Sequence, residues 1–195
     1  PEWLEFRRNH IGASDAPIIM GNSISNRTWL QLWEEKVLGK KQATNRGMEH
    51  GNEWEPRIRA WACKEYGLEF VPEVVVSAKH PWMMASLDGA CGTHVIEIKR
   101  VDEEKHQLAT EKVVPPCYVA QLQHIMETLE LSEMTYISSF KHHIEHFNVE
   151  YDPEYIKKMV EQEQLFYDLV MRMDPPEMSD GDKICKDTDP KWISH

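Results

Sequence analysis

The chain has 195 residues, of which 41% are hydrophobic and seven are tryptophan, so it can bury one sizeable core and is expected to form one main domain. Its net charge of −11 argues against a protein coated in basic surface, and it disfavours nucleic-acid binding unless basic groups gather at a channel. The four cysteines lack any C-x-x-C pair, which disfavours zinc and iron–sulfur sites and predicts free thiols in a reducing cytoplasm. No apolar run predicts a membrane span.

The first third of the chain is predicted to be mainly helical. Residues 1–20 read as a short amphipathic segment and then a helix that Ser14 can cap. Apolar residues that step by three and four predict a second helix over residues 28–38 and a longer one over residues 45–66.

Strands and helices then follow in an order that predicts a mixed sheet. Segments rich in β-branched and aromatic residues, separated by Pro or Gly, predict three successive strands. The expected elements in chain order are strands over residues 71–77, 82–87 and 93–99, a helix over 117–131, strands over 134–140 and 144–151, and a helix over 153–172. This order does not suit a doubly wound parallel fold. The domain is expected over residues 1–172, followed by an acidic arm with prolines over residues 173–195.

Two acids and a lysine gather at the second and third predicted strands. Side chains alternate faces along a strand, so Glu97 and Lys99 share one face of an otherwise apolar segment. Asp88 lies nine residues before Glu97, with Gly89 and Gly92 available to turn the chain. Carboxylates suit Mg²⁺, and a nearby lysine can orient or help deprotonate a water, as metal-assisted phosphodiester hydrolysis requires. A salt-bridged pair on an edge strand has the same spacing, so the motif alone leaves both interpretations open.

Further polar residues can complete such a site. Glu55, on the long helix, can add to the metal shell, although a solvated acid in a first helical turn is the alternative. Gln121 can position a water, and Tyr118, one turn earlier, can touch a phosphate; hydrogen bonds to neighbouring loops are the alternative for both.

An anion site is a further possibility in the first half of the chain. Arg7, Ser14 and Ser86 can together hold a terminal phosphate, because a guanidinium, hydroxyls and free N–H groups suit an anion. Two other groups of residues are expected to be structural: a solvated hairpin histidine cluster at His142, His143 and His146, and core tryptophans at Trp29, Trp33, Trp54 and Trp61.

Four motifs in a fixed order together carry a resemblance to a known family. They are Arg7…Ile11-Gly12-Ala13-Ser14-Asp15, Gly51-x3-Glu55, Ser86-Leu87-Asp88-Gly89…Glu97-Ile98-Lys99 and Tyr118-x-Ala120-Gln121-x-Gln123. This order resembles the lambda exonuclease family, the YqaJ-like phage recombination exonucleases of the PD-(D/E)xK, or restriction-endonuclease-like, superfamily. The resemblance extends over roughly residues 4–170, and it departs from the family where Leu87 replaces the usual proline before the first acid.

The resemblance implies a role for each matching residue. Asp88, Glu97 and the backbone carbonyl of Ile98 are implied to bind Mg²⁺, for which Mn²⁺ substitutes, with two ions per site. Lys99 is implied to act on the attacking water, and Glu55 and Gln121 to form the outer shell of the metal site. Three residues are implied to form a pocket for the 5′-phosphate: Arg7, Ser14 and Ser86. Arg27 is implied to reach into a groove of the DNA, and Met48 to act as an apolar wedge that splays the end of the duplex.

The resemblance also implies the fold and the activity. The fold is α/β (α+β), a restriction-endonuclease-like core in which helices flank both faces of a central mixed β-sheet. The activity is Mg²⁺-dependent 5′-to-3′ degradation of one strand of linear double-stranded DNA to mononucleotides, which leaves 3′ overhangs for a single-strand annealing protein in recombination. A ring-shaped homotrimer in the cytoplasm of a bacterial host, encoded by a phage or prophage, is implied as well. An endonuclease or junction resolvase, or a catalytically silent scaffold that binds DNA or protein, is the alternative.

Overall fold

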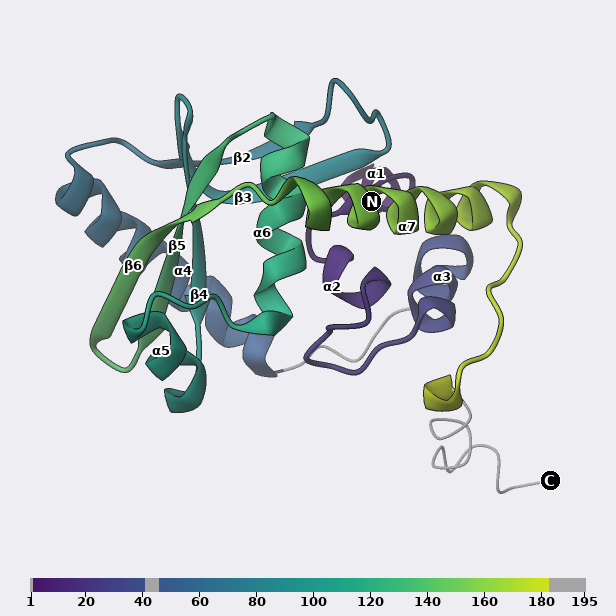
Figure 1. The fold of residues 1–195 in the computed structure, drawn as a ribbon, viewed down its shortest axis with the longest axis horizontal. Helices are drawn as coiled ribbons and strands as arrows, with labels where there is room; N and C mark the ends of the chain where they lie inside the picture. The colour runs from purple at the N-terminus through teal and green to yellow at the C-terminus, as the bar shows by residue number, and fades with distance from the viewer. Residues whose placement is uncertain (1, 41–45, 183–195) are drawn as a thin grey trace.

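Six strands and seven helices make up the part of the chain that the structure describes (Figure 1). The structure is a computed structural model, and it describes residues 2–40 and 46–182, with side chains apart from those of residues 3, 4 and 46–53. The strands are β1 (Ile11–Gly12), β2 (Val71–Val76), β3 (Met83–Cys91), β4 (His94–Arg100), β5 (Glu133–Phe140) and β6 (His143–Glu150). The helices are α1 (Glu2–Arg8), α2 (Ala16–Ile19), α3 (Trp29–Leu38), α4 (Arg46–Tyr66), α5 (Glu103–Thr110), α6 (Pro116–Leu129) and α7 (Pro153–Arg172).

The strands form one mixed sheet in the order β1-β3-β4-β5-β6, and β2 pairs with β3. Strand β2 runs antiparallel to β3 along most of its length. On the other edge of β3, β1 pairs in parallel with Met83 and Met84, and β4 pairs only with Gly89, Ala90 and Cys91. Among the described residues, 85–88 therefore have no strand partner on that edge. Strands β3 and β4 separate there, and we call this separation the opening between β3 and β4.

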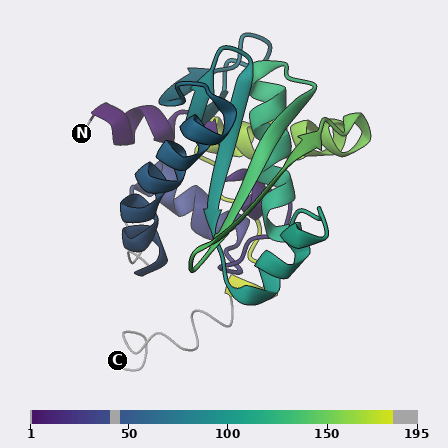
Figure 2. The ribbon, with the colours of Figure 1, turned by 90° about the vertical axis from the view of Figure 1, so that its left-hand side faces the viewer.

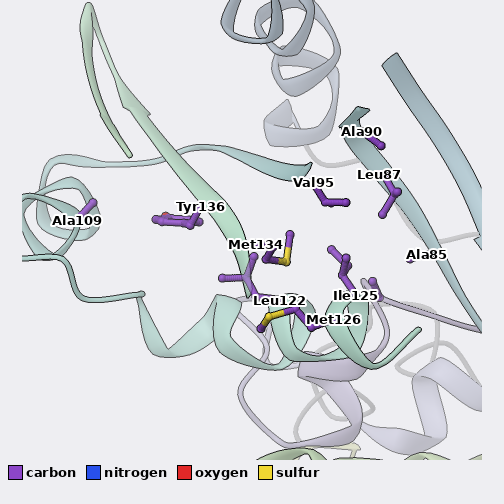
Figure 3. Close-up of a cluster of buried hydrophobic side chains, with 11 residues drawn as sticks. Ala85, Leu87, Ala90, Val95, Ala109, Leu122, Ile125, Met126, Met134 and Tyr136 are labelled. Carbon is purple, nitrogen blue, oxygen red and sulfur yellow. The ribbon is translucent and has the colours of Figure 1, made fainter. Parts of the chain in front are cut away.

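Helices cover both faces of the sheet, as expected for this fold class. On one face, Ile58 and Ala62 of α4 pack against Ile96, Ile98 and Ile137. On the other face, side chains of α6 pack against β3, β4 and β5 (Figure 3). Figure 2 shows α4 and α6 on opposite sides of the strands. The mixed α+β prediction is thus confirmed. None of the described helices is long and apolar enough to cross a membrane.

A separate cluster joins α3 and α7 to the start of the sheet. Leu32 and Trp33 of α3 pack with Phe166 of α7 and with Ile11 of β1. Helix α3 begins at a capping box, in which the side chain of Thr28 accepts from the N–H of Gln31. The hydroxyl of Thr28 also donates to Asp182, so residues 174–182 return to the start of α3. The rest of the expected acidic arm lies outside the described residues.

Two local predictions are wrong. Strand β3 does not end before Asp88 but continues to Cys91, because its pairing with β2 extends to Ala90, and the turn falls at Gly92 with a φ of 61°. Gly89 lies inside the strand, where a Cβ would come within 2.9 Å of the Ile96 side chain. Ser14 does not cap α2, which begins after Asp15.

Candidate active site

Asp88 faces the opening between β3 and β4. Its Oδ2 accepts a hydrogen bond from the backbone N–H of Ile98 at 2.8 Å. The bond crosses the gap where the two strands no longer pair, so it fixes the carboxylate beside the segment of β4 that carries Glu97. Local strand separation, rather than a turn, creates this juxtaposition.

Glu97 is held by side chains from two elements. Its Oε1 accepts from Lys99 Nζ and from Gln121 Nε2, each at 2.6 Å, so α6 places its glutamine over the sheet face that carries the acid. The residue is only 1% exposed, and its Oε2 is buried without a hydrogen-bond partner among the described residues. A buried carboxylate oxygen without a donor is costly unless a cation or another donor meets it.

The protonation of this cluster follows from burial and from mutual charge. Burial, and then the negative charge of Glu97, raise the pKa of Asp88 to about 8, although Lys99 opposes the shift. Burial disfavours the charged form of Lys99, but the charges of Glu97 and Asp88 outweigh it and raise the pKa of the ammonium. Lys99 therefore remains a cation, whereas Asp88 ionises only at a higher pH than an ordinary aspartate unless a cation comes to the site.

Glu55, on α4, is linked to Asp88 through the side chain of Arg59. Its Oε1 accepts from Arg59 Nη1 at 2.8 Å, and the same nitrogen donates to the backbone carbonyl of Asp88. The charge of Glu55 also contributes to the raised pKa of Asp88. Arg59 is a site residue that the sequence analysis missed. Its spacing of four residues from Glu55 on a helix is the one signal that could have indicated it.

The donor set fits a small, hard cation. Asp88 and Glu97 offer carboxylate oxygens, and the unpartnered Oε2 of Glu97 is the oxygen best placed to take a ligand. Within the described ranges, no three His, Cys, Asp or Glu side chains form a metal-binding group by themselves. The remaining positions would therefore fall to a backbone carbonyl and to water, which Mg²⁺ accepts because it keeps several of its own waters.

Tyr118 packs beside the lysine. Its ring centroid lies 5.6 Å from Lys99 Nζ, and burial raises the pKa of the phenol. The ring thus limits the positions open to the ammonium while remaining uncharged. Its expected contact with a phosphate stays a prediction.

The three residues expected to bind a phosphate lie near one another on neighbouring elements. Arg7 Nη2 donates to Ser14 Oγ at 3.1 Å, and Ser14 is exposed just beyond β1. The parallel pairing of Gly12 with Met84 leads the chain after β1 along β3 toward Ser86, which is also exposed. Asp88 lies two residues beyond Ser86 on β3, so the predicted phosphate-binding residues lie next to the carboxylates of the candidate site.

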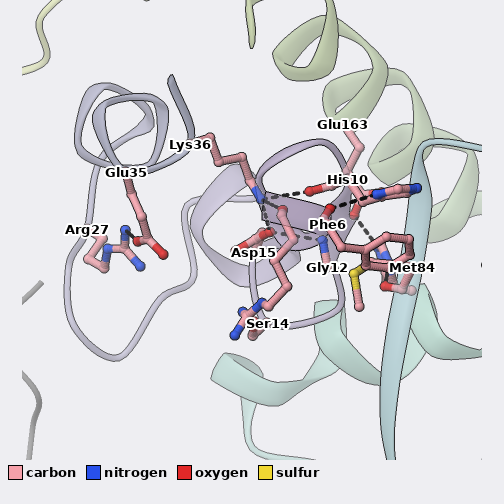
Figure 4. A network of polar contacts seen from close by, with 12 residues as sticks. Phe6, His10, Gly12, Ser14, Asp15, Arg27, Glu35, Lys36, Met84 and Glu163 are labelled. Carbon is pink, nitrogen blue, oxygen red and sulfur yellow. Dashed lines mark hydrogen bonds and ion pairs between the residues drawn. The ribbon is translucent and has the colours of Figure 1, made fainter. Parts of the chain in front are cut away.

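A buried ion pair holds this region in place (Figure 4). Lys36 Nζ contacts Asp15 Oδ2 at 2.7 Å and donates to the backbone carbonyls of Arg7, at 3.1 Å, and His10, at 2.7 Å. Burial opposes the charge on Asp15, but Lys36 outweighs it and lowers the pKa of the carboxyl. The sequence analysis missed this pair, which ties α1, α2 and α3 together beneath Arg7.

The two remaining predicted DNA contacts lie elsewhere. Arg27 Nη2 pairs with Glu35 Oε2 at 2.5 Å, and the arginine side chain is 16% exposed (Figure 4). The side chain of Met48 lies outside the described residues, although its backbone belongs to α4. Neither is brought to Asp88 or Glu97 by any described contact.

Comparisons with known proteins agree with this fold. The model of the YqaJ-like viral recombinase domain matches residues 2–132. The alkaline exonuclease LHK-Exo from Laribacter hongkongensis has a similar structure, with a TM-score of 0.74 and 22% identity over 89% of this chain and 93% of that one. Its complex with dAMP gives a TM-score of 0.73 at the same identity and coverage. A phage related exonuclease from Haemophilus somnus 129PT gives 0.61, with 16% identity over 84% of this chain and 96% of that one. No curated protein sequence matches the chain.

Proposed function

The chain belongs to the YqaJ-like viral recombinase family, and on this premise we propose that it is a Mg²⁺-dependent exonuclease that degrades one strand of linear duplex DNA. The proposed direction is 5′ to 3′, with mononucleotide products and a 3′ overhang that serves a single-strand annealing protein. One observation carries the proposal. Asp88, Glu97 and Lys99 converge at the opening between β3 and β4, and a buried oxygen of Glu97 there has no hydrogen-bond partner within the described part of the chain.

Asp88, Glu97 and the backbone carbonyl of Ile98 would hold the proposed metal, and we propose two ions per site. When bound, Mg²⁺ polarises the scissile phosphate and lowers the pKa of a coordinated water. Gln121 donates to Glu97 Oε1 and so leaves Oε2 as the oxygen free to act as a ligand. Arg59 restrains both Glu55 and the backbone of Asp88. This chain thus supplies a pre-organised set of oxygen atoms.

Lys99 acts in this proposal as a fixed positive charge. Because the neighbouring acids raise its pKa, the ammonium keeps its proton and donates hydrogen bonds to the attacking water and to the developing phosphorane oxygens. Tyr118 and Glu97 restrict its position from two sides. The lysine is thereby placed to orient the nucleophile.

A cleavage assay tests the function directly. The substrate is a linear duplex with a labelled 5′-phosphorylated strand, offered with Mg²⁺ beside a closed circular duplex. We expect the wild-type chain to release labelled mononucleotide from the linear DNA and to leave the circle intact. Asp88→Asn and Lys99→Met should each lower kcat by about a hundredfold or more, because the first removes a proposed metal ligand and the second removes a positive charge beside the developing negative charge.

Glu161→Gln changes an exposed acid on α7 and should leave the rate unchanged. Cutting of the circle would instead indicate an endonuclease. Undiminished cleavage by Asp88→Asn would remove the proposed site.

A further inference from the structure

Trp54 is flanked by two arginines next to the candidate active site. Arg57 Cζ lies 5.3 Å from the centroid of the Trp54 ring, and Arg100 Cζ lies 4.7 Å from it. Trp54 is only partly buried, whereas both arginines are exposed, so the expectation that Trp54 belongs to the core is wrong. Its ring instead joins the first half of α4 to the end of β4 near the surface.

These two arginine side chains have no acidic partner in the described part of the chain. Neither Arg57 nor Arg100 forms an ion pair or a side-chain hydrogen bond there, although the sequence has 33 acidic residues and 22 basic ones. By contrast, Arg27 and Arg59 each hold a carboxylate. Two like charges beside one ring repel each other, so the arrangement is suited to an anion that adds negative charge.

The position of the stack relates it to the catalytic residues. Trp54 directly precedes Glu55 on α4, and Arg100 directly follows Lys99 on β4. Because side chains alternate along a strand, Arg100 faces the α4 side of the sheet, whereas Lys99 faces the α6 side. A nucleic-acid strand that leaves the opening between β3 and β4 on the α4 side would meet the two guanidinium groups first.

We infer that Arg57 and Arg100 bind backbone phosphates of the DNA strand adjacent to the scissile bond, and that Trp54 holds both guanidinium groups in place. A guanidinium that stacks on an indole keeps its N–H edges free for a phosphate, and the stack restricts its motion before the DNA arrives. Phosphate contacts position a strand without reading its sequence, as a nuclease that acts along any duplex requires. The inference rests on the proposed function and adds a strand-binding site to it.

Salt-dependent binding tests the inference. The probe is a fluorescent 5′-phosphorylated duplex, titrated with the full-length chain in EDTA over a series of KCl concentrations. The double variant Arg57→Gln/Arg100→Gln should reduce the slope of log K against log salt by about 1 to 2, since each lost phosphate contact removes nearly one counterion from the release. In Mg²⁺, KM should rise by about tenfold at moderate salt while kcat changes far less.

Two matched variants separate charge from structure. Arg172→Gln removes an exposed arginine at the end of α7 and should keep the wild-type slope. Arg57→Lys/Arg100→Lys keeps the charge but loses the planar stack, so it should restore most of the slope with weaker binding. A lower Tm with an unchanged slope in the double Gln variant would overturn the inference, since the arginines would then only pin α4 to β4. Wild-type chain that neither binds nor digests the duplex would contradict the proposed function itself.

Discussion

Charge balance is the feature that governs the candidate site at the scale of single residues. Three carboxylates, from Glu55, Asp88 and Glu97, face two cations, Arg59 and Lys99. Each cation contacts one acid directly. The neighbouring acids keep Lys99 protonated, while burial and the charge of Glu97 make Asp88 hard to ionise. A site of this kind is poised to accept positive charge.

Arg7 should determine how strongly the enzyme depends on a 5′-phosphate. Arg7→Ala removes the guanidinium beside Ser14, so digestion of phosphorylated ends should slow by about tenfold or more, consistent with the loss of a charge-assisted contact. Unphosphorylated ends should be digested at nearly the same rate as by the wild-type chain. The measurement is the initial rate on two duplexes that differ only in the 5′ group, with Arg172→Ala as the control. Equal losses on both substrates would contradict a phosphate pocket here.

The residues that sequence reasoning could find are those whose partners lie close along the chain. Glu97 and Lys99 follow from strand periodicity, and their contact at 2.6 Å is local. The Lys36–Asp15 pair depends on helices that pack against distant segments, so no spacing rule indicates it. For Arg59, the four-residue spacing from Glu55 indicates the pair on the helix but not its contact with the backbone of Asp88. Trp54 was misassigned for a related reason, since helical spacing does not distinguish a core tryptophan from one beside a strand end.

At the scale of elements, the separation of β3 from β4 creates the site. The strands pair closely at Gly89, where Ile96 leaves no room for a side chain, and then diverge so that Asp88 bonds the backbone of Ile98 with its carboxylate. The sequence indicated both strands and the mixed sheet. It did not indicate that β3 continues past Asp88, because two glycines in this segment resemble a turn, and pairing with β2 overrides that local signal.

A buried histidine joins three elements and should make stability depend on pH. His124 of α6 bonds Glu163 Oε1 of α7 through Nδ1 at 2.8 Å and the carbonyl of Met84 in β3 through Nε2 at 3.0 Å. Because both partners accept, the ring donates from both nitrogens as an imidazolium. Burial opposes its charge, but Glu163 outweighs burial and raises the pKa of His124 above its ordinary value of 6.5.

Since the folded-state pKa of His124 is the higher one, its contribution to stability is fully present below about pH 6.5 and is lost as the pH rises through the folded-state pKa. We expect the free energy of unfolding of the wild-type chain to fall over that window by up to about 1.4 kcal/mol per pH unit, relative to His124→Gln/Glu163→Gln. Urea unfolding of both proteins from pH 6 to pH 9 measures it. Parallel curves across that range would show that the ring is neutral in the folded chain.

At the scale of the whole molecule, the acidic net charge must be reconciled with a DNA substrate. The chain has a formal charge of −11, yet Arg7, Arg57, Lys99 and Arg100 all lie on the elements that form the candidate site. A local concentration of positive charge attracts DNA even where the rest of the surface repels it. A ring of three copies that encloses the duplex would strengthen this effect, and we propose such a homotrimer.

Molecular mass in solution tests the ring. We expect the purified chain to behave as a trimer of the 22.9 kDa protomer in light scattering, over the concentrations used for the cleavage assay.

A ring would also make digestion processive, so one labelled duplex should be degraded to its end before a competitor duplex that is added later is attacked. A monomer that digests in a distributive manner would contradict the ring while leaving the active site untouched. Closed assemblies of identical subunits are the usual form of homo-oligomers.

The brief contact of β1 with β3 has a consequence for what each reaction cycle removes. It brings Arg7 and Ser14, which we predict to bind the 5′-phosphate, toward Ser86, on the same strand as Asp88 and two residues before it. Two residues of an extended strand span about 6.6 Å, which is close to the spacing of successive phosphates along one nucleic-acid chain. The distance from Ser86 to Asp88 along β3 would then match the length of one nucleotide. Each reaction cycle would therefore release a single nucleotide, and the geometry of the β3 backbone would set that product length.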